Sequence, residues 1–193
     1  MTSPSEDTTT RADARRNRAR LLTAALELYA AEGTDVSLKA IAGAAGVGVG
    51  TIYRHFPTRE ALLEAAYRNE VEQLCDVEAL LRDRPPDAAL AEWMHRFIDY
   101  AVTKRGLSGA LRSIAASGSN IYDETRRQII AALTTLLEAG VAAGTIRADV
   151  DADSVFHATG AIWLIPDEPG WADQARKVLA LVMDGLRQGA AGD

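Results

Sequence analysis

Apolar residues recur every three or four positions along almost the whole chain, which is the spacing that places side chains on one face of a helix. Good helix formers such as Ala, Leu, Arg and Glu are frequent, and no segment alternates β-branched and polar residues as a strand does. The pattern therefore predicts an all-α protein. About nine helices are expected, over residues 11–32, 37–43, 49–55, 58–82, 87–104, 107–116, 122–143, 152–164 and 170–188.

Glycine and proline interrupt this pattern and divide the chain into parts. Gly33 follows the first apolar stripe where a C-terminal cap is expected, Gly46 marks a turn, and Pro57 ends the third helix. Residues 1–10 are rich in Ser and Thr and lack the apolar run of a secretory signal, so they are expected to form a disordered tail. The predicted domains are a three-helix N-terminal domain at 11–57 and a larger helical bundle at 58–193.

Charge is distributed unevenly along the chain, although the net value is −6. Residues 11–59 hold eight Lys/Arg against four Asp/Glu, whereas residues 60–193 hold 13 against 21. Nucleic-acid binding needs a local basic face and not a basic whole, so the N-terminal domain remains a candidate for it. The single cysteine, Cys75, excludes an internal disulfide, and no stretch approaches the roughly 18 apolar residues of a membrane span. A cytoplasmic protein with no membrane partner is expected.

Residues 37–56 have the spacing of a helix-turn-helix. Two short helices that cross steeply need a small residue where their backbones meet, which Ala42 provides, and a turn residue that accepts positive φ, which Gly46 provides. Four apolar residues are expected to point inward and to pack the second helix against the first. The opposite face of the second helix is then free to enter the major groove of DNA. The four apolar residues are Ile41, Ala45, Val47 and Ile52.

This segment resembles the signature of the TetR family of transcriptional regulators over roughly residues 15–65. The matching residues are Ala42, Gly46, Thr51-Ile52-Tyr53, His55-Phe56 and Arg59-Glu60-Ala61-Leu62. Further along, Gly144-Thr145-Ile146-Arg147 and residues 180–186 resemble one C-terminal subgroup of actinobacterial type. The resemblance implies a homodimer built from the last two helices, a small-molecule effector bound among the middle helices, and repression of an operator that the effector relieves.

The resemblance also implies individual roles on double-stranded operator DNA. Tyr53 and His55 match the family's phosphate contacts, Thr51 matches a hydroxyl that meets the backbone or a base, and Arg59 stands where the family usually has lysine. Arg54 projects from the second helix of the motif, and its side chain is suited to bidentate contacts with guanine. The predicted DNA-binding residues are Arg15, Arg16, Ser37, Lys39, Gly48, Val49, Gly50, Thr51, Tyr53, Arg54, His55 and Arg59.

Some of these assignments have a structural alternative. The arginines of residues 11–20 could extend along the DNA backbone or could form a solvated helix face. Tyr53 could be a core residue and His55 a polar surface residue. Gly48 stands where a Ser or Thr often caps the recognition helix and Gly50 lies inside that helix, and each costs about 1 kcal/mol relative to Ala, so a softer helix is expected.

The larger domain contributes candidates for effector binding and dimerisation. Pockets between helices are mostly apolar with a few polar groups, and the predicted effector-binding residues are Trp93, Met94, Phe97, Tyr100, Arg112, Tyr122, Phe156, His157 and Trp163. Core packing is the alternative for each of them. The last helix has a broad apolar face with few partners left in the chain, so a second copy is expected to cover it. The predicted dimer residues are Val155, Thr159, Ile162, Val178, Leu179, Val182 and Leu186.

Two other functional classes compete with a ligand-released regulator. A small helical enzyme is disfavoured because the three histidines have no metal-ligand spacing and no phosphate loop or nucleophile motif is present; no metal or cofactor is expected. A helix-turn-helix protein that responds to a protein partner, or that binds no ligand, stays open. An enclosed cavity between the middle helices would favour a sensor, and a filled core would favour this second class.

Overall fold

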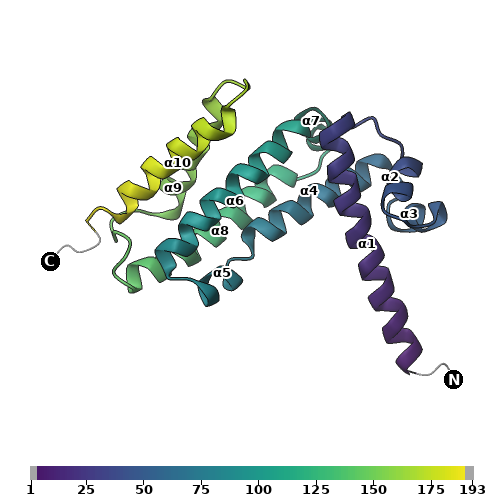
Figure 1. Cartoon of the computed structure of the whole chain (residues 1–193), viewed down its shortest axis with the longest axis horizontal. Helices are drawn as coiled ribbons and strands as arrows, with labels where there is room; N and C mark the ends of the chain where they lie inside the picture. The colour runs from purple at the N-terminus through teal and green to yellow at the C-terminus, as the bar shows by residue number, and fades with distance from the viewer. Residues whose placement is uncertain (1–3, 190–193) are drawn as a thin grey trace. The chain divides into compact units, whose positions relative to one another are not determined.

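The computed structural model describes residues 4–189, with side chains from residue 12 onward, and every element in that range is helical (Figure 1). This confirms the all-α prediction for the described part of the chain. None of its helices is both long and apolar enough to cross a membrane. The elements are α1 (Pro4–Glu32), α2 (Leu38–Ala44), α3 (Val49–His55), α4 (Arg59–Cys75), α5 (Glu78–Asp83), α6 (Pro86–Gly106), α7 (Ser108–Ala116), α8 (Ile121–Ala142), α9 (Ala152–Gly160), the 3₁₀-helix η1 (Ala161–Leu164) and α10 (Trp171–Arg187).

Three segments differ from the sequence-based expectation. The single helix expected at 58–82 is two helices, because α4 ends at Cys75 and α5 begins at Glu78; Val77 between them and Leu80 of α5 are both buried. The helix expected at 152–164 tightens into η1 after Gly160, as helix C-termini often do. Residues 4–10 of the predicted disordered tail belong to α1. The helix begins at Pro4, and proline suits a first helical position because its ring restricts φ to a helical value. Residues 1–3 lie outside the described range.

The chain forms two compact units, and each contains segments that are distant in sequence. The first unit comprises residues 1–69 and 103–121, and the second comprises residues 70–102 and 122–193. The first unit therefore contains α1 to α3, most of α4, and α7. The predicted boundary between residues 57 and 58 stays a prediction.

In the first unit, short hydrogen-bonded turns place α2 against α1 and α3 against α2 (Figure 1). Ser37 caps α2 by accepting a hydrogen bond from the Ala40 N–H at 3.1 Å. At the other end of α2, Val47 N–H donates to the Ala42 carbonyl and Gly46 N–H to the Gly43 carbonyl, both at 3.0 Å. This pair of bonds is a Schellman motif, and it requires the positive φ of 62° that Gly46 adopts. The predicted role of Gly46 is confirmed.

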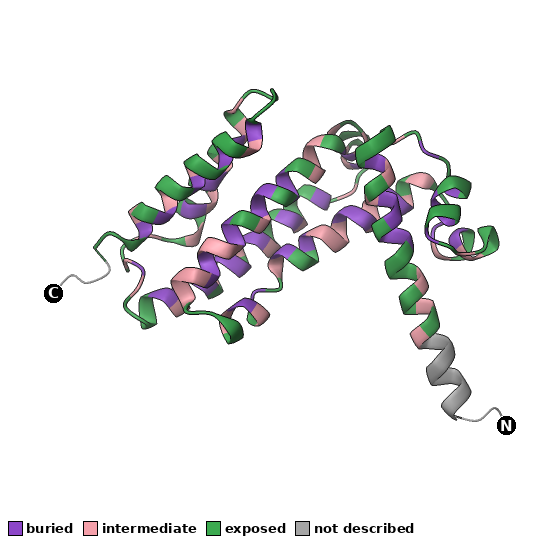
Figure 2. Cartoon of the chain, viewed as in Figure 1, coloured by how far each residue is buried: buried purple, intermediate pink, exposed green. Residues whose placement is uncertain are grey.

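The second unit has a core of aromatic and aliphatic side chains from α6 and α8. Trp93 stacks on Phe97 with ring centroids 5.3 Å apart, and Phe97 lies 5.7 Å from Tyr100. All three are buried, as are Leu133 and Leu136 of α8. The stripe that predicted the helix of residues 87–104 is therefore the face that packs inward (Figure 2).

A close turn after α8 joins the last helix to this unit. Gly144 ends α8 in the left-handed region, with Thr145 N–H donating to the Gly140 carbonyl at 2.9 Å. Ile146 then packs directly over Gly140, and the Arg147 N–H donates to the Leu186 carbonyl at the end of α10 at 2.9 Å. The segment Gly144-Thr145-Ile146-Arg147 is thus an anchor for α10.

Candidate nucleic-acid interface

Helix α3 has one buried face and one open face. Ile52 is fully buried and Phe56, which follows the helix, is 4% exposed, so these two side chains fix α3 to the rest of the first unit. Away from this buried face, Tyr53 is 52% and Val49 41% exposed, and the two side chains lie one helical turn apart on the surface. The alternative reading of Tyr53 as a core residue is wrong.

Arg54 lies along this open face. Its Nε donates to the Gly50 carbonyl at 3.3 Å and a terminal nitrogen donates to the Thr51 hydroxyl at 3.4 Å. Both bonds are long, so an oxygen of a phosphate or a base can replace them at little cost. Gly50 and Thr51 therefore keep the Arg54 guanidinium at the surface of α3, where it can contact DNA.

The other predicted residues of the motif occupy caps or exposed positions. Gly48 is the N-cap of α3 and gives no side-chain hydrogen bond there, as its lack of a hydroxyl requires. Lys39 is exposed on α2, and Ser37 uses its hydroxyl for the cap of that helix. His55 is half-buried, with its ring 6.1 Å from that of Phe56.

The arginines of α1 divide into two groups. Arg15 and Arg16 are exposed, and Arg16 pairs with Asp13 one turn earlier in the helix. By contrast, Arg20 donates to the carbonyl of Gly46 at 3.4 Å, and the Arg18 guanidinium stands 5.7 Å from the centre of the Phe56 ring. These two residues support the turn and the end of α3. In the sequence analysis both arginines belong to a possible DNA-binding arm. Their contacts with Gly46 and Phe56 join positions far apart in the sequence, so no local pattern predicts them.

Arg59, predicted to meet DNA phosphate, is turned toward its own unit. Its guanidinium donates to the carbonyl of Thr34 and pairs with the Asp35 carboxylate at 3.0 Å. It also lines a cavity of about 200 Å³ together with residues of α7. Nearby, burial raises the pKa of the Tyr29 hydroxyl, and the charge of Arg59 partly opposes that rise. The geometry gives Arg59 a positioning role, linking the start of α4 to the loop before α2.

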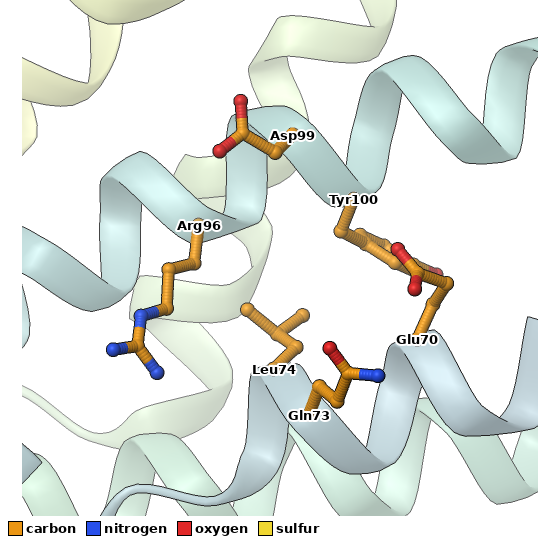
Figure 3. Close-up of a pocket in the computed structure, with 6 residues that line it drawn as sticks. All are labelled: Glu70, Gln73, Leu74, Arg96, Asp99 and Tyr100. Atoms are coloured by element: carbon orange, nitrogen blue, oxygen red, sulfur yellow. The ribbon is translucent and has the colours of Figure 1, made fainter. Parts of the chain in front are cut away.

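The predicted effector-binding residues do not meet in one cavity. Trp93 and Phe97 are packed in the core, so they fill the space that an enclosed pocket would need. Arg112 lies exposed on α7 in the first unit, whereas Tyr122 belongs to the second. Tyr100 lines a cavity of about 240 Å³ between α4 and α6 (Figure 3), and Met94 lines one of about 210 Å³ between α6 and α10.

Three further candidates for effector binding lie on α9 and η1. Phe156 is half-buried under the Arg126 guanidinium, which is 5.3 Å from the ring centre. His157 is exposed and its Nδ1 is 2.7 Å from the Asp153 carbonyl, while Trp163 is half-buried. None of these three lines the cavity beside Tyr100. A larger groove of about 600 Å³ lies along α8, with Leu137 and Val141 among its apolar lining.

The predicted dimer residues fall into a buried and a half-buried group. Five of them, Val155, Thr159, Ile162, Leu179 and Leu186, are at most 4% exposed because α9, η1 and α10 pack on each other within one chain. These five therefore cannot form an exposed seam. Val178 and Val182 are half-buried on the other side of α10, beside Leu181, which is 73% exposed. Leu164 of η1 is 86% exposed, and the predicted dimer residues include neither of these two leucines.

Comparisons with known proteins agree with this architecture. Residues 21–66 match the family model of the bacterial regulatory proteins of the tetR family, and residues 85–188 match that of the C-terminal domain of SbtR-like transcriptional regulators. The crystal structure of the TetR transcriptional regulator SCO0520 from Streptomyces coelicolor is 50% identical and superposes with a TM-score of 0.80, covering 88% of this chain and 98% of that one.

Two other relatives extend the comparison. A TetR transcription regulatory protein from Mycobacterium vanbaalenii is 36% identical, with a TM-score of 0.75 over 92% of this chain and 99% of that one. The transcriptional repressor KstR2 of Rhodococcus jostii is 28% identical over 201 residues, which cover 96% of this chain and 98% of its own length. The likeness therefore includes both the helix-turn-helix and the C-terminal helices.

Proposed function

The chain belongs to the tetR family of bacterial regulatory proteins and is a DNA-binding transcriptional regulator, and we propose that it is a homodimeric repressor that a small molecule releases from a palindromic operator. The open face of α3 carries this proposal, because Tyr53 and Arg54 stand exposed on a helix that Ile52 anchors from behind. A helix of this kind enters the major groove and reads base edges with its exposed side chains.

The two apolar faces of α10 support dimerisation. Leu179 and Met183 are buried within the chain's own core, whereas Val178 and Val182 are half-buried and Leu181 is 73% exposed. A second apolar face on a surface helix is what a self-complementary interface needs. In the dimer, two copies of α3 would reach successive major grooves about 34–36 Å apart, which is the reason to expect a palindrome.

Repression and ligand release rest on different support. The relative from Rhodococcus jostii is named a repressor, which favours repression here as well. The cavities between α4 and α6 and along α8 offer places for an effector, although the filled aromatic core keeps regulation by a protein partner as the alternative. An effector releases DNA only if it binds the non-binding conformation more tightly.

Selection of bound sequences from a random DNA pool tests the proposal, followed by titration of the selected site with variants. Arg54→Ala should relax preference at one base position, because an arginine contact to guanine contributes about 1–3 kcal/mol of discrimination. Lys39→Ala should weaken all sequences alike and lower the salt dependence by about one counterion. Arg82→Ala, which removes an exposed cation on α5, is the matched control and should change neither property. Selected DNA bound equally by all three variants would disprove the assigned interface.

The same proposal includes a cytoplasmic location, where operator DNA lies, and no catalytic role. Burial raises the pKa of the Cys75 thiol to about 12, so this side chain is protonated near neutral pH and is a poor nucleophile.

A further inference from the structure

Val49 leaves an aliphatic side chain exposed on α3, the helix that carries the proposed DNA interface. It is 41% exposed, and Tyr53, one helical turn later, is the other large apolar residue exposed on this helix. The buried residue of α3 is Ile52, which holds the helix against the rest of the first unit. Packing within the first unit therefore leaves much of the Val49 side chain free to contact another molecule.

Glycines on both sides of Val49 leave it without neighbouring side chains in the sequence. Gly48 and Gly50 are both exposed, and a Cβ added at Gly50 would meet nothing within 4 Å. Without side chains at these two positions, the backbone can come close to a ligand. Further along, the Thr51 hydroxyl already accepts a hydrogen bond from Arg54 at 3.4 Å. Reading helices contact base edges with their first residues, and here Val49 supplies the side chain for that contact.

The chemistry of valine limits which base edge it can recognise. Its side chain has no hydrogen-bonding group, so it can select a base only through an apolar contact. In the major groove thymine presents an apolar 5-methyl group, whereas cytosine presents an amino donor and the purines present polar acceptors. A polar group covered by the valine would lose its water without gaining a partner. Because valine has one preferred χ1 rotamer in a helix, packing it against a methyl group costs little conformational entropy.

Resting on the proposed function, in which α3 reads the operator, we propose that Val49 packs against the 5-methyl group of a thymine in each operator half-site. Arg54 would select guanine through hydrogen bonds, and Val49 would add a second requirement that depends on a methyl group alone. The operator of this chain then contains one thymine per half-site whose methyl group, and not its hydrogen-bonding edge, determines affinity.

A methyl contact differs from the phosphate contacts of the same interface in its response to salt. A cation such as Lys39 adds affinity by releasing counterions from the DNA, so its contribution falls as the salt concentration rises. The methyl group carries no charge, and its contact with Val49 releases no counterion. The ratio of affinities for DNA with and without this methyl group should therefore be the same at about 50 mM and about 200 mM salt.

Deoxyuridine tests the contact directly, because it lacks the 5-methyl group of thymidine and keeps the same hydrogen-bonding groups. The duplex that the wild-type protein selects from a random pool is synthesised with each thymine of one half-site replaced in turn, and Kd is measured by fluorescence anisotropy. One replacement should raise the wild-type Kd about fourfold, the ratio for removing one methyl group from an apolar contact. Val49→Ala, which removes both γ-methyl groups, should reduce this ratio to below about twofold. Val102→Ala is the matched control, since Val102 is a 51% exposed valine of α6, and it should keep the wild-type ratio.

Two results would overturn the inference. The first is a selected duplex in which no deoxyuridine weakens binding by the wild-type protein. The second is a loss that has the same size in Val49→Ala, which would assign the methyl contact to another residue such as Thr51. Circular dichroism of each variant excludes loss of folding as the cause. Failure to select any DNA would reject the proposed function, whereas selected DNA that is insensitive to the methyl group would reject only the Val49 contact.

Discussion

Replacing Gly140 by alanine tests how closely the end of α8 packs against the turn that follows it. A Cβ atom at this position would lie 3.0 Å from the Cβ of Ile146 and closer still to its Cγ1. Ile146 is 2% exposed, and a rotamer change cannot move its Cβ, so the backbone itself has to shift. The same backbone carries the bond from Arg147 to Leu186, so the strain would reach the end of α10.

The magnitude follows from two opposing effects. Overpacking a buried site costs about 1–3 kcal/mol, and alanine in place of glycine within a helix recovers at most about 1 kcal/mol. Because the contacted atoms are at the base of the isoleucine side chain, we expect the upper end of that range for Gly140→Ala. The net loss is then about 2 kcal/mol, or a fall of about 4–8 °C in Tm for a chain of this size.

Thermal unfolding at one fixed protein concentration measures this loss, since self-association would otherwise contribute to Tm. Gly109→Ala is the control, because Gly109 lies in α7 and an added Cβ there meets nothing within 4 Å. Its Tm should stay the same or rise. Ile146→Ala combined with Gly140→Ala should cost less than the sum of the single changes. A Gly140→Ala protein as stable as wild type would refute the close packing described here.

Three further predictions concern single sites. Gly46→Ala should destabilise the fold by about 1–2 kcal/mol in denaturant titration, because a Cβ is strained at positive φ. Ser37→Ala should cost about 0.5–2 kcal/mol in the same assay, since the Ala40 N–H loses its cap, and no change would contradict the cap. The raised pKa of Glu70 lets the folded state hold this proton to a higher pH than the unfolded state, so its stability contribution is lost as pH rises through the folded pKa. Glu70→Gln should therefore raise Tm relative to wild type near about pH 8 but not near about pH 4, and the opposite trend would contradict this assignment.

The features that sequence alone could predict are those set by local spacing. The period of apolar residues gave the helices, and Gly46 was identified because a tight turn after α2 needs positive φ. The break between Cys75 and Glu78 could not be predicted, because the apolar period continues through it and Val77 and Leu80 are both buried, as they would be in one continuous helix.

Contacts between distant segments were beyond prediction for a related reason. A stripe of apolar residues shows that a face is buried but not which element covers it. The apolar face of α10 was therefore assigned to a second copy, although Leu179 and Leu186 are buried within one chain. Likewise, nothing local distinguishes an arginine such as Arg59, which binds Thr34 and Asp35, from one that faces solvent.

The inclusion of α7 in the first unit has a practical consequence for protein engineering. Ile114 of α7 lines the same cavity as Arg59, and the Ser119 hydroxyl after α7 donates to Glu64. A fragment that stops at residue 69 would lack residues 103–121, and with them the α7 wall of this cavity and the hydrogen bond from Ser119 to Glu64. Chimaeras that graft this operator specificity onto another regulator should therefore transplant both stretches, because a single cut between the units does not exist in the sequence.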